Sequence, residues 1–315
     1  LVVLSLTWLE RKVLGRLQLR LGPTRTGPMG LMQPIADAIK LLLKEDLIPS
    51  ESDKAVFYVA PVIVMISAFM IWVTIPGAQN AVLRNLELGL FYITAFAVVG
   101  ILGLVLAGWG SANKYGVMGG LRSAAQLISY EIPIIMVIVS VAMLAQSLDL
   151  RVVVNDQNPI PYALILPLGL VIFFIAGLAE VGRTPFDIYH AESEIVGGPF
   201  VEYSGAHWAV FFLAEYINTF AIGALVTIMF LGGWLGPVLP GIVWFLIKVY
   251  GVILVIFWVR GTLPRLRIDQ LMAFAWKAMV PLSFYMILIT AVYLFYGWPA
   301  WTLTLMSGAG LLVVG

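Results

Sequence analysis

Acidic residues crowd into one short part of the chain. Six of them fall within 36 positions that hold a single base, Arg183, so this segment carries a formal charge of −5 with histidine neutral. They are Glu180, Asp187, Glu192, Glu194, Glu202 and Glu215. If the segment folds back into the protein, its crowded carboxyls suit the uptake and release of protons; if it stays in water, it is a solvated face or a weak divalent-cation site. The apolar, glycine-containing stretch at residues 195–200 favours folding back.

Three ionisable residues lie inside long apolar runs, namely Glu131, Glu215 and Lys248. Charged groups are costly in a bilayer, so residues of this kind commonly handle protons or ions. The alternative is a buried ion pair that only fixes the register of neighbouring helices. Because several such residues occur in one chain, proton handling is the favoured interpretation.

The elements that carry these residues are predicted to span a membrane. The 315 residues are 61% hydrophobic and only 11% charged, too few charges to cover a soluble domain of this size. The chain opens without Met inside an apolar run, Leu1 to Leu9, which we expect to be the truncated end of a first span. Seven further charge-poor runs are long enough to cross a bilayer. They lie near residues 55–76, 88–109, 124–148, 160–180, 208–234, 238–259 and 278–297.

Because these runs are continuously apolar rather than alternating, they predict helices and not the strands of a barrel. The expected fold is all-α, a polytopic bundle of about eight spans that forms one integral membrane domain over residues 1–315. The break at Gly297, Trp298 and Pro299 leaves room for the start of a ninth span.

Basic residues predict the orientation of the bundle. Fifteen Lys and Arg residues fall in one set of alternate loops, while the opposite set holds only Arg84 and Arg151. Since cytoplasmic loops carry the excess of positive charge, the first loop, residues 10–54, and the acidic loop, residues 181–207, are expected to be cytoplasmic.

The first loop contains a predicted amphipathic helix near residues 30–45. Its apolar positions recur at helical spacing, whereas its charged positions gather on another face. The apolar set is Leu31, Ile35, Ile39 and Leu42, and the charged set is Asp37, Lys40 and Lys44. Such a helix lies in the membrane interface or against a partner, or packs on its own protein, and the pattern does not choose between these.

Composition excludes several classes of function. A formal net charge of +1 argues against nucleic-acid binding. Without cysteine, and with only two histidines, the chain offers no thiolate metal site, no ordinary iron–sulfur ligation and too few ligands for two haems. Phosphate-binding loops, nucleophile elbows and zinc-protease motifs are absent from the sequence as well. If electrons move through the assembly, another subunit carries them.

A series of motifs along nearly the whole chain carries a family resemblance. They are ERK at 10–12, QLRLGP at 18–23, GLMQPIADAIK at 30–40, SYE at 129–131, RTPFD at 183–187, VEY at 201–203, AEY at 214–216 and PRLRIDQLM at 264–272. In this order they resemble the H-type membrane subunit of proton-pumping NADH:quinone oxidoreductase, respiratory complex I. The resemblance implies a subunit of a bacterial cytoplasmic membrane enzyme that is not catalytic alone.

The family further implies that this subunit forms much of a quinone chamber, with quinone as substrate and no covalently bound cofactor. Iron–sulfur clusters and flavin are expected in partner subunits, above all in a cluster-bearing soluble neighbour at the quinone site, and adjacent membrane subunits and lipid complete the surroundings. By resemblance, residues at the chamber, its entrance or its partner contacts are Arg20, Gln33, Asp37, Lys40, Arg183, Phe200, Arg265 and Arg267. Residues that resemble a proton relay are Glu131, Glu180, Asp187, Glu192, Glu194, Glu202, Glu215 and Lys248.

One position departs from the family pattern. Many relatives carry Glu where this chain has His190, which can exchange protons near neutral pH but has the opposite charge sign.

Rival interpretations are the equivalent subunit of a membrane-bound hydrogenase or of a coenzyme-F420-linked complex, a stand-alone ion transporter, and a purely structural subunit. A transporter predicts inverted repeats and discontinuous spans, which the sequence does not reveal, and a structural role leaves the acidic loop unexplained.

Overall fold

The computed structural model describes residues 1–188 and 192–312, and the side chains of all of these except residues 192, 193 and 312. His190 and the side chain of Glu192 therefore lie outside the described residues. Within the described part the regular elements are helices, which confirms the predicted all-α class. Their bounds are α1 Val2–Leu17, η1 Pro28–Gly30, α2 Gln33–Leu43, α3 Lys54–Ile71, α4 Gly89–Gly110, α5 Lys114–Ala145, α6 Leu150–Asp156, α7 Tyr162–Ile165, α8 Pro167–Val181, α9 Glu192–Ile195, η2 Gly198–Phe200, α10 Gly205–Phe230, α11 Gly241–Thr262, α12 Ile268–Phe274, the π-helical η3 Ala275–Met279, α13 Val280–Tyr296 and α14 Ala300–Leu312.

Six helical stretches of the described chain are long and apolar enough to cross a membrane: α3, α4, α5, α10, α11 and the continuous stretch from α12 to α13. Large apolar side chains on their outer faces are open, for example Val59 at 49%, Phe91 at 65% and Leu288 at 63% exposure. Exposed apolar surface of this extent is what lipid-facing helices present. The fold is therefore a polytopic helical membrane bundle.

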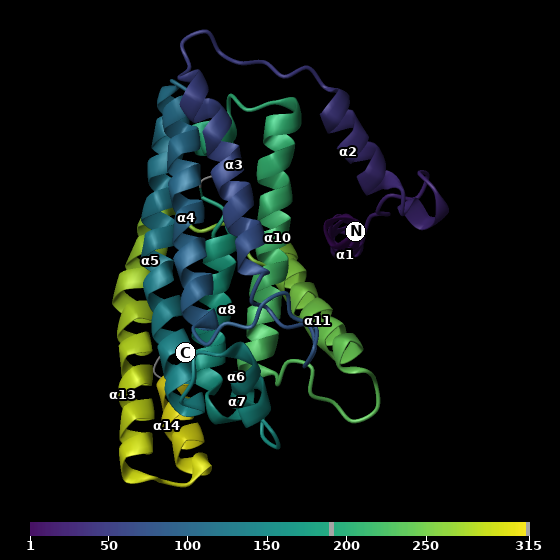
Figure 1. Ribbon diagram of the computed structural model, residues 1–315. Coiled ribbons are helices and arrows are strands. Elements are labelled where there is room, and N and C mark those ends of the chain that lie inside the picture. Colours follow the sequence, from purple (N-terminus) through teal and green to yellow (C-terminus); the bar gives the residue numbers. More distant parts are fainter. Residues whose placement is uncertain (189–191, 313–315) are drawn as a thin grey trace.

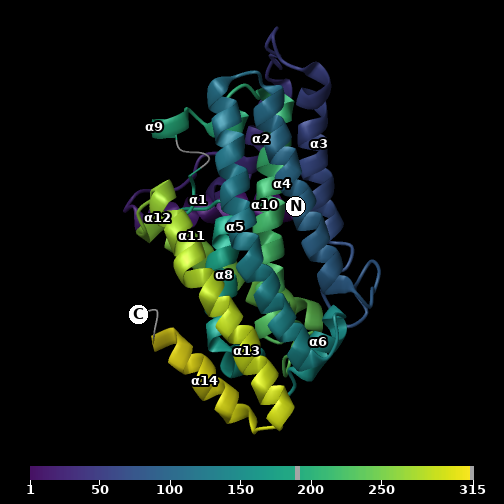
Figure 2. The same cartoon turned by 90° about the vertical axis from the view of Figure 1, so that its left-hand side faces the viewer.

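The bundle is layered around α10. In Figure 1, α3, α4 and α5 stand side by side, while α10 runs next to α3 and α8, and α11 leans away from its lower end. Figure 2 shows α13 lying along α5, with α14 returning beside α13. Helix α1 is seen nearly end-on in Figure 1, and α2, which contacts α1 and α10, lies at the end of a long link to α3.

Several helix boundaries differ from the predicted apolar runs. Helix α5 begins at Lys114 because Asn113 caps it: the Asn113 Oδ1 accepts a hydrogen bond from the Tyr115 amide at 2.9 Å. Glu131 therefore lies in the middle of this helix. The run at 160–180 breaks at Leu166, and Pro167 then opens α8, since proline lacks the N–H that a continuous helix needs. Helix α1 continues beyond Glu10 to Leu17.

The acidic loop packs tightly onto α5. A Cβ atom added to Gly119 would lie 2.4 Å from Cα of Gly198, so the backbones of α5 and η2 approach as closely as glycine permits. This contact brings the segment before α10 against the bundle. The prediction that the acidic segment folds back is thereby confirmed for its described part. Its Glu194 and Glu202 contact Arg122 and Asn113, near the end of α5 that carries Lys114.

Candidate functional site

The turn after α8 positions the centre of the site. Gly182, at φ 66°, ends α8 in the left-handed conformation and directs Arg183 back across the bundle. From α5, Gln126 Nε2 donates hydrogen bonds of 2.8 Å to the carbonyl oxygens of both Ala179 and Phe186. This side chain therefore clamps the end of α8 and the following turn onto α5.

Five side chains from four parts of the chain meet at this turn, and we call them the arginine-paired cluster. The members are Glu10 of α1, Arg183, Glu215 and Tyr216 of α10, and Arg260 of α11. Arg183 Nη1 lies 3.7 Å from Glu10 Oε1 and its Nε lies 3.3 Å from Glu215 Oε1. Arg260 also pairs with Glu10, and the Tyr216 hydroxyl donates to Glu10 Oε2 at 2.5 Å.

This cluster is balanced in charge, and its centre at Glu10 and Arg183 is buried, whereas the side chains of Glu215 and Arg260 are 19% and 28% exposed. Glu10 and Arg183 are each 4% exposed, and the Arg183 guanidinium lies 4.6 Å from the ring centre of Tyr216. Two carboxylates face two guanidiniums, so each buried charge has a partner, which is the condition under which burial is tolerated. The cluster joins α1, α10 and α11 to the end of α8.

Glu131 of α5 and Glu180 of α8 form a second group, which we call the unpaired carboxyl pair. Both Glu131 oxygens and Glu180 Oε2 are buried without a hydrogen-bonding partner in the described part of the chain. The two carboxyls are close enough to repel each other when charged. They line a cavity of about 60 Å³ whose other walls are mostly apolar, including Ile134 and Phe173.

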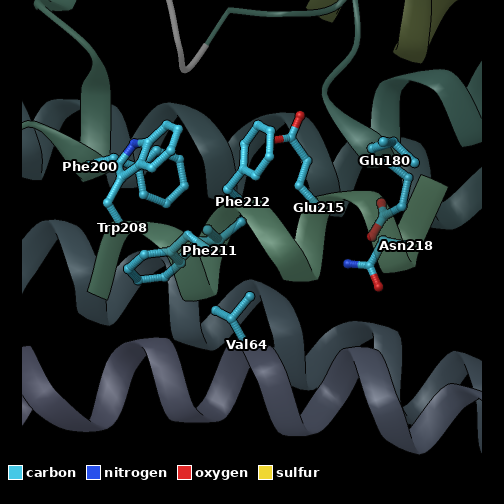
Figure 3. Close-up of a pocket in the computed structure, with 10 residues that line it drawn as sticks. Val64, Glu180, Phe200, Trp208, Phe211, Phe212, Glu215 and Asn218 are labelled. Carbon is cyan, nitrogen blue, oxygen red and sulfur yellow. The ribbon is translucent and has the colours of Figure 1, made fainter. Parts of the chain in front are cut away.

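A second cavity of about 60 Å³ lies next to the first and reaches towards the acidic loop. Glu180, Glu215 and Asn218 line it together with an aromatic wall formed by Phe200, Trp208, Phe211 and Phe212. Figure 3 shows the Glu180 carboxyl directed at Asn218, while Glu215 points to the other side of α10. Glu180 and Asn218 line both cavities, so the two hollows meet at these side chains.

The remaining acids of the loop bind other elements. Glu202 Oε1 accepts a 2.6 Å hydrogen bond from Asn113 Nδ2. Glu194 pairs with Arg122 of α5 at 2.6 Å, and Asp187 pairs with Arg265 at 3.3 Å. These contacts fasten the loop to α5 and to the segment before α12.

Two further contacts hold the loop at the start of α10. The Tyr203 hydroxyl donates to the Phe57 carbonyl at 3.3 Å, and burial raises the pKa of Tyr203, so this phenol stays protonated. His207 pairs with Asp46 in the link between α2 and α3. The loop therefore touches α3, α5 and that link at once.

Asp37, one of the predicted entrance residues, lines a groove between α1, α2 and α10. This groove has a volume of about 320 Å³ and apolar walls that include Leu41 and Leu213. At the rim of this groove, the Asp37 carboxylate accepts hydrogen bonds from Arg11 Nη1 at 2.5 Å and from Gln33 Nε2 at 3.2 Å. Of the predicted apolar face of α2, only Leu42 lines the groove, whereas Leu31, Ile35 and Ile39 are exposed. The groove is lined instead by Pro34, Ala38 and Leu41, together with Asp37 from the predicted charged face.

Other predicted residues are not gathered at the groove. Arg20 Nε donates to Gln18 at 2.7 Å, Lys40 is exposed on α2, and Arg267 stands at the start of α12. Lys248 is also apart from the acids: its Nζ donates to the carbonyl oxygens of Leu231 at 2.7 Å, Gly233 at 3.1 Å and Leu235 at 2.8 Å. It thus caps the open C-terminal turn of α10.

Four residues of the site were not predicted from the sequence: Glu10, Tyr216, Asn218 and Arg260. Glu10 and Tyr216 stand inside quoted motifs, and Arg260 was counted only as a loop charge. Asn218 has no charge, but it lies three residues after Glu215, so the two side chains are neighbours on the surface of a helix. That spacing is the one signal in the sequence that could have revealed it.

Fold and site together define a polytopic helical membrane protein whose interior carries a connected set of ionisable side chains. A sequence profile described as NADH dehydrogenase matches residues 1–291. The H subunit of the NADH-quinone oxidoreductase of Dehalococcoides mccartyi strain 195 is 49% identical over 289 residues, which cover 92% of this chain and 82% of the relative. The H subunit from Syntrophotalea carbinolica is 49% identical over 296 residues, 91% of this chain and 90% of the relative. That of Brevibacillus brevis is 48% identical over 295 residues, 92% and 88% respectively. The chain belongs to this NADH dehydrogenase family.

Proposed function

We propose that the chain is the H-type membrane subunit of an NADH-quinone oxidoreductase in a bacterial cytoplasmic membrane. It forms much of the quinone chamber and couples reduction of the quinone to proton translocation. The relatives that carry this name match over 82% and 90% of their own length, which supports the assignment. The observation that carries the mechanism is the row of buried acids from Glu10 through Glu215 and Glu180 to Glu131.

The groove between α1, α2 and α10 is the proposed way in for quinone. Its apolar walls suit a long hydrocarbon tail, while Arg11, Asp37 and Gln33 at one rim offer polar contacts. The exposed cations Lys40 and Arg20 on the same part of the chain are available to partner subunits. We expect the partner at this face to be the cluster-bearing soluble subunit, which supplies the electrons.

Reduction of a quinone to a quinol consumes electrons and protons together, and the protein must respond to that demand. In the proposed mechanism the acidic loop, residues 181–207, senses the change in the chamber through Asp187, Glu194 and Glu202. Their partners sit on α5 and beside α12, so a shift of the loop is felt at both. Arg183 then links the loop to Glu215, which borders the cavities of the unpaired carboxyl pair.

Low-dielectric surroundings make every charge change at these sites large in energy, which suits coupling over a distance. The arginine-paired cluster holds the geometry, and the unpaired carboxyl pair carries protons. Positive-inside statistics support a cytoplasmic position of the first loop, residues 10–54, and of the acidic loop. Protons would then enter the acidic route from the cytoplasmic side.

The test uses the whole complex in proteoliposomes, with NADH as donor and a short-chain ubiquinone as acceptor. Glu202→Gln and Glu215→Gln should each lower quinone reduction, or proton pumping per quinone, at a normal content of assembled complex. Glu87→Gln is the matched control, since Glu87 is an exposed acid outside the site. Unchanged turnover and pumping in both test variants would contradict the proposed relay.

A further inference from the structure

Asn218 occupies the junction of the two small cavities. One cavity is bordered by Glu215 and Glu180, the other by Glu180 and Glu131, and Asn218 lines both. Its Oδ1 is buried without a hydrogen-bonding partner in the described part of the chain. Figure 3 shows the Glu180 carboxyl facing this amide. A buried acceptor of this kind is costly unless something donates to it.

The other neutral polar side chains in the cavity that Glu131 and Glu180 line are already engaged with their own helices. Ser67 Oγ donates to the Val64 carbonyl at 2.8 Å, and Thr94 Oγ1 donates to the Phe91 carbonyl at 2.9 Å. The amide of Asn218 can donate and accept at the same time without changing charge. It is therefore the neutral group best suited to connect carboxyls on its two sides.

The cavities are large enough for this connection to include water. Each has a volume of about 60 Å³, and a water molecule takes up roughly 30 Å³ in the liquid. Buried water is held where several polar groups converge. The carboxyls of Glu180 and Glu131 and the Asn218 amide meet that requirement, whereas the apolar residues around them, such as Ile134 and Leu225, exclude a wider channel.

We propose that Asn218 is a positioning residue that joins the two cavities into one hydrogen-bonded route from Glu215 through Glu180 to Glu131. The amide holds the Glu180 carboxyl between the cavities, donating to its charged form and accepting from its protonated form. The route rests on the proposed function, because it is the path that the proposed relay would take. Asn218 carries no proton of its own along this route.

The experiment compares variants of the assembled complex by NADH-driven quinone reduction and proton pumping. Asn218→Leu keeps the size of the side chain but removes its hydrogen bonds, and should lower coupled turnover roughly tenfold. Asn218→Ser leaves a polar group and room for water, and should restore most of the activity. Thr219→Val is the matched control: Thr219 is the next residue of α10, its hydroxyl donates to the Glu215 carbonyl at 2.8 Å, and it lines neither cavity.

A pH profile separates a role in the route from one in packing. Asn218→Asp places a further titratable group at the junction and should displace the pH optimum of turnover, which a packing role would leave in place. If Asn218→Leu prevents assembly of the complex, this profile decides alone, and an unchanged optimum overturns the inference. Turnover of Asn218→Leu equal to that of Thr219→Val would overturn it as well.

Two further variants distinguish failure of this inference from failure of the proposed function. If Glu180→Gln and Glu215→Gln slow coupled turnover while Asn218→Leu does not, the relay stands and the bridging role of Asn218 falls. If all three variants behave like the wild type, the proposed relay falls together with the bridge.

Discussion

The two groups of buried carboxyls differ in what surrounds them, although both consist of glutamates within a membrane bundle. In the arginine-paired cluster, Glu10 and Glu215 face Arg183 and Arg260. In the unpaired carboxyl pair, Glu131 and Glu180 face each other across an apolar cavity. A partner of opposite charge holds a carboxylate in one state, while its absence leaves the proton as the means of neutralising it. The same residue type thus serves as an anchor in one place and as a proton carrier in the other.

The two groups are also joined through Glu215. This residue binds Arg183 on one side and borders a cavity shared with Glu180 on the other. A change of charge in the arginine-paired cluster therefore alters the electrostatic surroundings of the unpaired carboxyl pair. Variants that move one group towards the condition of the other test whether pairing with arginine separates their roles.

The largest effect is expected from Arg183→Leu, which turns the paired cluster into an unpaired one. Loss of this buried cation leaves Glu215 without its guanidinium and Glu10 with Arg260 alone, and should destabilise the protein by about 3–5 kcal/mol. Thermal unfolding of the purified complex measures the change. Arg265→Ala is the matched control, because its pair with Asp187 is partly exposed and should contribute only about 0–1 kcal/mol. Equal losses in the two variants would contradict the anchoring role.

Replacing single acids by glutamine should have opposite consequences in the two groups. Glu10→Gln removes a charge that two guanidiniums need, so we expect a loss of about 2 kcal/mol in stability. Glu180→Gln removes a buried charge that has no partner and should leave stability equal or higher, while coupled turnover falls. Unfolding midpoints and quinone reduction are measured on both variants. A stability loss in Glu180→Gln as large as in Glu10→Gln would remove the distinction.

Lys248 was predicted to join the relay, and its contacts allow a direct test of that prediction. Lys248→Met removes three hydrogen bonds to the end of α10 and should cost about 1.5 kcal/mol in stability. If the lysine acts mainly as a cap, pumping per quinone stays at the wild-type value in the assembled complex. If Lys248 belongs to the relay, pumping falls without a comparable loss of stability.

The smallest effect on stability is expected where an acid of the loop is paired at the surface. Arg122→Ala breaks the pair with Glu194, whose side chain is 44% exposed, and should change stability by about 0.5 kcal/mol or less. Because the proposed mechanism passes movement of the acidic loop to α5 through this pair, quinone reduction should fall even though stability hardly changes. Unchanged quinone reduction in Arg122→Ala would remove Glu194 from the proposed route.

Much of the fold could be predicted because apolar length and charge are written directly in the sequence. The run at 88–109 became α4 with a shift of one residue, and the run at 55–76 became α3, which ends earlier, at Ile71. The predicted helix boundaries were wrong where a local feature outweighed hydropathy. Asn113 makes α5 begin earlier than its apolar run, and Pro167 divides the run at 160–180. Capping and proline geometry act over one turn, which a search for long apolar runs passes over.

The acidic residues of the site were found, but not their partners. Glu131, Glu180 and Glu215 stood out as acids in apolar surroundings. Which of them is paired depends on contacts across the bundle: Glu10 meets Arg183 and Arg260 over separations that no spacing rule predicts. Asn218 was missed because a neutral amide on a buried helix gives no compositional signal until its cavities are known.

The most direct test of the central claim is the infrared difference spectrum of the complex between its resting state and its state after addition of NADH and quinone. Protonation changes of a carboxyl alter its C=O stretching band. If the unpaired carboxyl pair transfers protons, part of this band is lost in Glu180→Gln and in Glu131→Gln, whereas the whole band persists in Glu10→Gln. A band that survives in both Glu180→Gln and Glu131→Gln, or that disappears in Glu10→Gln instead, would contradict the assignment of proton transfer to the unpaired carboxyl pair.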